Sequence, residues 1–212
     1  MNCENSKGRE ILSDDSLNIF WEKLRNLFAS MDEKYANVAA QYGFVCDGCD
    51  ENCCMTRFHH HTLLEFFHLK RAIEELAGDF RMRLAEKAKG VVAAHAEADQ
   101  KKEAVRIMCP LNFEGRCIVY ENRPMICRLH GIPSEWRPPG RPNGTGLVVM
   151  PGCDAFSRQC ESMNYRPFDR TPFYLQLSAL EKDFKNRVGC GRKIKMTVAQ
   201  IVLCDSDDVS QT

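Results

Sequence analysis

The sequence has no net charge and no long apolar run, and each absence excludes a class of protein. Its 29 basic and 29 acidic residues balance to a formal charge of +0. Without a basic surplus, neither nucleic acid nor an anionic membrane surface is favoured as a partner. No run of about eighteen apolar residues occurs, and the polar start of the chain lacks the layout of a secretory signal. We therefore expect a cytoplasmic protein with no membrane-bound segment.

Motifs that would identify a common enzyme class are also missing. The sequence contains no phosphate-binding glycine loop, no nucleophile elbow and no dinucleotide fingerprint, and Gly144-Thr145-Gly146 lacks the context that such motifs require. No internal repeat of fixed period is present. The sequence therefore does not indicate a substrate.

Cysteine is the residue type that the chain has in abundance, with twelve in all. In the cytoplasm, glutathione and thioredoxin keep thiols reduced, so these residues are better interpreted as metal ligands or reactive groups than as disulfides. A secreted disulfide scaffold is disfavoured because no signal sequence accompanies the cysteines.

Four cysteines lie within ten residues in the string "VCDGCDENCC", at Cys46, Cys49, Cys53 and Cys54. In a helix, at about 100° per residue, the first three would face one sector and Cys54 would point away. A turn at Asp47-Gly48 would also bring the first three together, because C-x2-C spacing allows two sulfurs to bind one tetrahedral ion. In either geometry Cys54 is directed to a second metal, a bridging position or the core.

A second set consists of Cys109, Cys117 and Cys127, followed by Cys153. A hairpin that turns at Glu114-Gly115 would return Cys117 beside Cys109, and a short helix would present Cys127. The two sets together supply eight thiolates, which suffice for two tetrahedral zinc sites or for one four-iron cluster with spare cysteines. The number of cysteines leaves this choice open.

Histidines near both sets are further candidate ligands. His130 stands three residues after Cys127, an arrangement that suits zinc. The run His59-His60-His61 precedes a helix start, so its residues are either ligands or a polar lead-in to that helix. The sequence leaves both questions open.

These cysteine motifs resemble those of the YkgJ-type cysteine-cluster family. The resemblance rests on C-x2-C-x3-C-C from Cys46 to Cys54, on Cys109-Pro110, and on "GRCIVYENRPMICR" from Gly115 to Arg128. It covers roughly positions 44 to 155. The resemblance implies zinc or iron bound by cysteine, including as an iron-sulfur cluster, although most members have no assigned reaction. A similar cysteine block occurs in flagellin lysine methylases, which points to modification chemistry.

Two arginines in the second block, Arg123 and Arg128, have two interpretations. Arginine beside metal-bound thiolates donates hydrogen bonds to sulfur and offsets the negative charge. The alternative is a surface salt bridge.

Apolar residues recur at helical spacing over most of the remaining chain. Thr62 and Glu65 form a capping box, and Thr171-Pro172 is a typical helix start. By contrast, residues 131–152 are rich in proline and glycine and are expected to form an irregular lid, binding loop or flap. The expected helices are 13–42, 62–90, 91–108, 125–129, 171–189 and 197–203.

We therefore predict a mainly α-helical single domain over residues 1–204, with an irregular metal-binding region at about 44–155, one small β-hairpin and a flexible tail at 205–212. Its predicted function is to chelate zinc or iron through cysteine, with no assigned reaction. One alternative is an iron-sulfur oxidoreductase or protein-modifying enzyme that uses the cluster under the 131–152 loop. Another is a zinc-ordered module that binds an unidentified protein partner.

Overall fold

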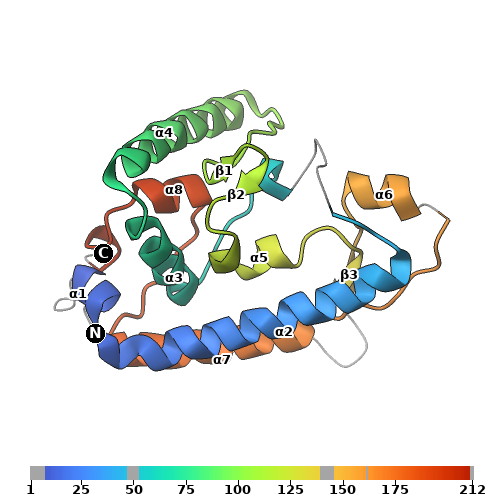
Figure 1. Ribbon diagram of the computed structural model, residues 1–212, viewed down its shortest axis with the longest axis horizontal. Coiled ribbons are helices and arrows are strands. Elements are labelled where there is room, and N and C mark those ends of the chain that lie inside the picture. Colours follow the sequence, from blue (N-terminus) through green and yellow to red (C-terminus); the bar gives the residue numbers. More distant parts are fainter. Residues whose placement is uncertain (1–7, 47–52, 139–145, 161, 211–212) are drawn as a thin grey trace. The chain divides into compact units, whose positions relative to one another are not determined.

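The computed structural model describes residues 8–46, 53–138, 146–160 and 162–210 (Figure 1). The chain is mainly α-helical, as predicted, and the strands among the described residues form two short antiparallel pairs. The contacts divide the chain into two compact units. Unit 1 comprises Met1–Trp21, Cys54–Pro124 and Glu181–Thr212, and unit 2 comprises Glu22–Cys53 and Met125–Leu180.

The helices are α1 (Gly8–Ser13), α2 (Asn18–Tyr42), α3 (Leu63–Glu74), α4 (Gly78–Lys101), α5 (Met125–Arg128), α6 (Asp154–Cys160), α7 (Thr171–Val188) and α8 (Val198–Leu203). The strands are β1 (Asn112–Phe113), β2 (Arg116–Cys117), β3 (Ser134–Trp136) and β4 (Val148–Met150). Single 3-10 turns are η1 (Asp15–Leu17), η2 (Cys53–Met55), η3 (Tyr120–Asn122) and η4 (Asp208–Ser210).

The first predicted helix, at 13–42, is interrupted near its start. The Asp14 carboxylate accepts a hydrogen bond from the Ser16 backbone N–H at 2.8 Å, and this contact caps η1 rather than a continuous helix. The long helix α2 begins at Asn18 and ends where Gly43 adopts a φ of 63°, a left-handed conformation that glycine adopts without steric cost. The predicted stop at Gly43 is therefore confirmed.

The break between the second and third predicted helices is at a different glycine. The sequence predicts it at Gly90, but α3 ends at Glu74 and α4 begins at Gly78, then continues through Gly90 to Lys101. A mid-helix glycine costs only about 1 kcal/mol relative to alanine, which the burial of the α4 face outweighs. Lys102, with a φ of 57°, ends α4, so residues 103–108 are not helical.

The core of unit 1 forms where α8 packs against α4 and α3 (Figure 1). Ala88 and Val91 of α4 contact Ala199 of α8, and small side chains allow these two helices to lie close together. Phe184 of α7 makes ring contacts with Trp21 at 5.5 Å and with Phe67 of α3 at 6.1 Å. The Phe184 ring thus joins α7 to Trp21 and to α3.

The proline-rich segment 131–152 contains two strands in unit 2, which corrects the prediction that it has no regular element. β3 pairs with β4 in antiparallel register, with Ser134 opposite Met150 and Trp136 opposite Val148. Valine and tryptophan favour strands, and this preference prevails at the two ends of the segment. Residues 139–145 lie outside the described part of the chain.

Aromatic contacts organise the rest of unit 2. The Phe156 ring of α6 packs edge-on against Tyr42, with centroids 4.8 Å apart, and against Phe44 at 5.3 Å. Tyr35 packs against Phe168 at 6.1 Å. The sequence analysis does not predict α6, and these contacts show how its seven residues are held.

The end of the chain, predicted as a flexible tail, contains two buried residues. Val209 lies in η4 and is only 2% exposed, and Ser206 is 3% exposed. Arg192 donates a hydrogen bond to the Asp208 carbonyl at 2.8 Å. Ser206 and Val209 are therefore packed against the rest of unit 1, and burial of the apolar Val209 side chain favours this arrangement. Residues 211 and 212 lie outside the described part.

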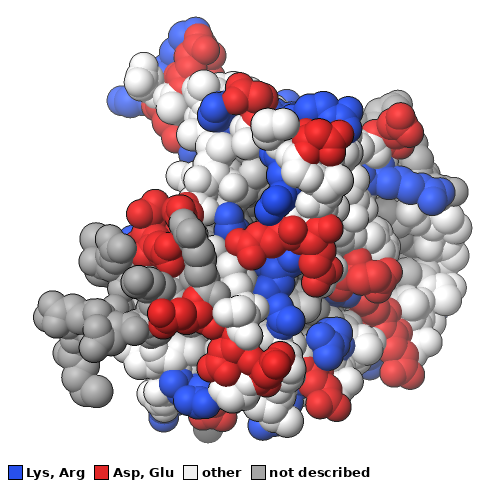
Figure 2. Space-filling model, turned by 60° about the vertical axis from the view of Figure 1, so that its left-hand side comes forward, with Lys and Arg blue, Asp and Glu red and all other residues white. Residues whose placement is uncertain are grey.

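The surface carries charges of both signs. Figure 2 shows lysine and arginine side chains interspersed with aspartate and glutamate on the face that it displays, in agreement with the zero formal charge. Among the helices that the structure describes, none is both long and apolar enough to span a membrane.

Candidate metal centre

Three cysteines of unit 1 are brought together by the small hairpin. The backbone N–H of Cys109 donates a hydrogen bond to the Cys54 carbonyl at 2.7 Å. Across the hairpin, Cys117 of β2 pairs with Asn112 of β1, whose backbone N–H donates to the Cys109 carbonyl at 3.0 Å. The predicted hairpin is confirmed, with Glu114 and Gly115 at its turn in left-handed conformations. We call Cys54, Cys109 and Cys117 the first thiol group.

The electrostatics of this group centre on Cys109. The pKa of the Cys109 thiol is raised to about 12, mainly by burial and to a smaller extent by negative charge on Cys54 and Cys117. The backbone N–H of Leu111 and the cation of Lys87 act in the opposite direction and lower this pKa. The thiol of Cys109 is therefore close enough to Cys54 and Cys117 for charge on them to affect its ionisation.

Lys87 is the cation that faces this group, and its position is held by two contacts. Its Nζ donates a hydrogen bond to the Asn112 carbonyl of β1 and lies 4.4 Å from the centre of the Phe113 ring. The sequence analysis does not identify Lys87, because it lies on α4, remote in sequence from the cysteines. No local motif could have indicated it.

Three cysteines of unit 2 lie near enough to Tyr35 for their charges to affect it, and we call Cys46, Cys53 and Cys153 the second thiol group. Burial raises the pKa of the Tyr35 hydroxyl, and negative charge on each of these three cysteines raises it further. Cys46 is exposed, while Cys53 and Cys153 are partly buried. Tyr35 could not be identified as a neighbour of the thiols from the sequence, because its place in the apolar pattern of α2 indicates only a core residue.

Two glycines allow Cys153 to lie near Tyr35. The Cys153 backbone N–H donates a hydrogen bond to the Gly131 carbonyl at 2.8 Å. Gly131 has a φ of 127°, and a Cβ atom there would collide with the Tyr35 hydroxyl. A Cβ at Gly152 would collide with the Phe156 ring. The Cys153 sulfur then accepts a hydrogen bond from the Phe156 N–H at 3.4 Å, at the start of α6.

The neighbouring pair Cys53 and Cys54 falls at the boundary between the two units. Cys53 belongs to unit 2, and Cys54 belongs to unit 1. The expectation that Cys54 points away from Cys46, Cys49 and Cys53 stays a prediction. Cys49 itself lies outside the described residues.

Cys127 lies in α5 of unit 2 and is partly buried. The adjacent Arg128 is buried, forms an ion pair with Asp32 at 2.5 Å and covers the Phe28 ring at 4.2 Å. Arg123, in unit 1, stacks on the Tyr120 ring at 3.4 Å. These contacts give both arginines a packing role, and hydrogen bonds from them to thiolates stay a prediction.

The histidines differ among themselves in their surroundings. His60 is buried, exchanges backbone hydrogen bonds with Met196 at 2.7 and 3.1 Å, and has no described hydrogen-bond partner for its Nε2 atom. Burial lowers the pKa of His60 to about 4. This environment fits a neutral, structural histidine, so the lead-in interpretation suits His60. His130 is partly buried, and its ligation stays a prediction.

The remaining described cysteines lie outside both thiol groups. Cys160 and Cys190 are buried, and the Cys160 sulfur lies 3.6 Å from the Tyr42 carbonyl. Cys204 is partly buried and donates to the Asp205 carbonyl at 3.3 Å. The buried positions of Cys160 and Cys190 are typical of cysteine used as a small core residue. Cys3 lies outside the described residues.

The two groups do not form a complete coordination shell. Within residues 8–46, 53–138, 146–160 and 162–210, no set of three or more histidine, cysteine, aspartate or glutamate side chains has the arrangement of a metal site. The eight predicted ligands therefore stay predictions.

We compared the chain with models of protein families, with curated proteins and with solved structures, and none of these comparisons found a match. The resemblance to the YkgJ-type family accordingly rests on the sequence motifs alone.

Proposed function

We propose that this protein binds zinc or iron through its clustered cysteines, with an iron-sulfur cluster as one form of the iron. The observation that carries the proposal is the position of Cys109, a partly buried cysteine whose backbone is hydrogen-bonded to Cys54 and whose thiol lies close enough to Cys54 and Cys117 to interact electrostatically with them. Three thiolates gathered in this way would repel one another, and a bound cation removes that repulsion.

The donor set suits these metals. Thiolate sulfur selects zinc and iron-sulfur clusters over magnesium or calcium, which prefer oxygen. The proposed ligands are Cys54, Cys109 and Cys117 of the first thiol group, Cys46, Cys53 and Cys153 of the second, and Cys49 and Cys127. A structural metal bound by such residues contributes folding free energy, on the order of 10 kcal/mol for zinc.

Backbone contacts support a structural role for the metal. The Cys54 carbonyl and the Cys109 N–H already form a hydrogen bond, so the two segments that would supply ligands are held together by the main chain. The hairpin that carries Cys117 has strands of only two residues each. Such a short hairpin has little stability of its own, and ligation at Cys109 and Cys117 would tie β2 to the segment that leads into β1.

The first experiment is to measure iron, zinc and acid-labile sulfide per chain, with a visible spectrum, on protein purified without oxygen. Zinc in a colourless protein supports a structural site, and iron with an equal amount of sulfide supports an iron-sulfur cluster. A metal-free protein that is as stable as metal-treated protein would contradict the proposal.

Single variants then identify the ligands. We expect Cys109→Ser and Cys46→Ser each to lower the bound metal per chain, because each removes a sulfur from one thiol group. Cys160→Ser is the matched control, since Cys160 is a buried cysteine outside both groups. If the groups bind separate metals, each ligand variant keeps the metal of the other group. If they share one cluster, either variant loses all of it.

An enzymatic role is the alternative that the same samples can test. An oxidoreductase that uses an iron-sulfur cluster requires a chromophore that dithionite bleaches and that air restores. A colourless protein containing zinc alone would exclude this alternative and would favour a zinc-ordered module that binds a partner protein.

A further inference from the structure

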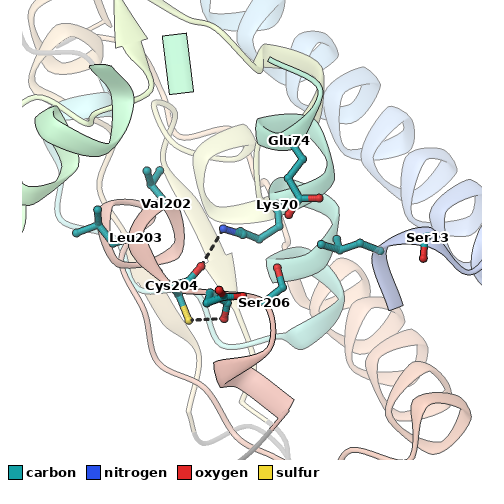
Figure 3. Close-up of a pocket in the computed structure, with 9 residues that line it drawn as sticks. Ser13, Lys70, Glu74, Val202, Leu203, Cys204 and Ser206 are labelled. Atoms are coloured by element: carbon teal, nitrogen blue, oxygen red, sulfur yellow. Dashed lines mark hydrogen bonds between the residues drawn. The ribbon is translucent and has the colours of Figure 1, made fainter. Parts of the chain in front are cut away.

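Unit 1 contains a cavity that involves neither thiol group (Figure 3). Its volume is about 710 Å³, within the range of small-molecule sites. The walls come from the end of α1, from α3, and from α8 with the segment that follows it. The lining residues are Leu12, Ser13, Lys70, Glu74, Val202, Leu203, Cys204, Asp205 and Ser206.

Two hydrogen-bond donors in the wall have unused capacity. Lys70 is 8% exposed, and its Nζ donates one described hydrogen bond, to the Cys204 carbonyl at 2.8 Å. An ammonium group carries three N–H donors, so two are left over. Ser206 is 3% exposed, and its Oγ has no partner among the described residues. A buried donor that lacks a hydrogen-bond acceptor costs free energy, and a ligand with acceptor oxygens would remove that cost.

Acidic side chains lie close to the same lysine. Glu74 follows Lys70 by one helical turn on α3, so the two side chains lie on the same face of that helix (Figure 3). The charges of Glu74 and Asp205 both raise the pKa of Lys70, while its burial, the larger effect, lowers it. The cavity therefore presents one cation and two carboxylates within a short distance.

The remaining wall is partly apolar. Leu12 of α1 is half-buried, and Val202 and Leu203 belong to α8. The position of α1 is set by Gly8, where a Cβ atom would collide with the Ser206 carbonyl. This close approach brings α1 against the segment that carries Ser206.

We propose that this cavity binds a small zwitterion of the α-amino acid type with an apolar side chain. Its carboxylate accepts hydrogen bonds from Lys70 and Ser206, its ammonium group faces Glu74, and its side chain lies against Leu12 and Leu203. A simple anion would meet two carboxylates, and a simple cation would meet the buried lysine. A molecule with a carboxylate and an ammonium group on the same carbon complements Lys70 and Glu74 of α3. This site is independent of metal binding.

The test is calorimetric titration of the full-length protein with L-phenylalanine, 2-phenylethylamine and 3-phenylpropanoate. The three probes share a phenylethyl group. Phenylalanine carries both charges, 2-phenylethylamine carries the cation alone, and 3-phenylpropanoate carries the anion alone. We expect phenylalanine to bind at least tenfold more tightly than either analogue. Equal binding of all three, or no saturable binding of phenylalanine at 10 mM, would overturn the proposal.

Variants separate the two charges. Glu74→Gln should weaken phenylalanine binding several-fold and strengthen binding of 3-phenylpropanoate, because it removes a carboxylate that attracts the ammonium and repels the anion. Glu75→Gln is the matched control, since Glu75 is the next residue, is exposed and does not line the cavity. Equal effects of Glu74→Gln and Glu75→Gln would contradict the assigned role.

The carboxylate end has its own variants. Ser206→Ala should weaken phenylalanine and 3-phenylpropanoate equally and leave 2-phenylethylamine unchanged. Lys70→Met should have the same pattern with a larger effect, provided that circular dichroism shows a folded protein. Because Ser206 has no described hydrogen bond to lose, Ser206→Ala tests the site even if Lys70→Met does not fold. Unchanged phenylalanine binding by Ser206→Ala would refute the proposed contact.

Discussion

Glu181 of α7 caps the start of α3, and replacing it should destabilise unit 1. Its two carboxylate oxygens accept hydrogen bonds from the backbone N–H groups of Leu63 and Leu64, each at 2.9 Å. Lys185 completes the arrangement with an ion pair to Glu181 at 2.9 Å. Leu63 and Leu64 are fully buried, so water cannot replace the lost acceptor. This contact joins two segments that are more than a hundred residues apart.

The expected cost of Glu181→Gln can be worked out from these contacts. The amide oxygen of glutamine accepts from one of the two N–H groups and leaves the other buried without a partner, which costs about 1–3 kcal/mol. Loss of the negative charge at a helix N-terminus costs roughly a further 0.3–2 kcal/mol. We expect the free energy of unfolding to fall by about 2–3 kcal/mol. In a chain of this size that corresponds to a thermal midpoint lower by roughly 5–10 °C.

Urea unfolding followed by circular dichroism measures this change, with the metal content of both proteins kept equal. Glu33→Gln is the control, because Glu33 is an exposed glutamate on α2. That variant should change the free energy of unfolding by less than about 0.5 kcal/mol. If Glu181→Gln behaves like the control, the carboxylate does not stabilise α3 and the reasoning is refuted.

Three further predictions concern pH and glycine. His60 has a pKa of about 4 in the folded protein, against an ordinary value of 6.5. As the pH falls, His60 is therefore protonated in the unfolded chain before it is protonated in the folded one. The free energy of unfolding should fall by about 3 kcal/mol between pH 6.5 and pH 4. His60→Gln should flatten that pH dependence in urea titrations, and an unchanged slope would contradict it. Gly131→Ala should destabilise unit 2 by at least about 2 kcal/mol, because its φ of 127° strains any side chain and the new methyl group meets Tyr35. Gly90→Ala should stabilise the protein by about 0.5–1 kcal/mol, since Gly90 lies inside α4 with open space around it; a loss of thermal stability would refute that prediction.

Local chemistry in the sequence predicted several helix ends correctly. Thr62 accepts a hydrogen bond from the Glu65 N–H at the start of α3, as the capping box requires. α7 begins at Thr171 and α8 follows Thr197, both at predicted positions. These ends depend on residues three or four apart, and such contacts form within one segment of chain.

Contacts between distant segments decided the features that the sequence analysis missed. The α3–α4 break lies before Gly78 rather than at Gly90, because α8 covers the α4 face around Gly90. The strands β3 and β4 require pairing across residues 137–147, which proline and glycine content alone cannot reveal. Each of these outcomes is determined by a partner that is not a sequence neighbour.

For the candidate metal centre, the sequence by itself determined the cysteines, their spacing and the soft-metal chemistry that thiolates favour. Only the tertiary structure divided them, with Cys54 beside Cys109 in unit 1 and Cys46, Cys53 and Cys153 near Tyr35 in unit 2. It alone also brought α1, α3 and α8 together around Lys70 and Ser206. The physical reason is that spacing limits which neighbours can share a ligand, whereas burial and charge at a site depend on every segment that packs against it.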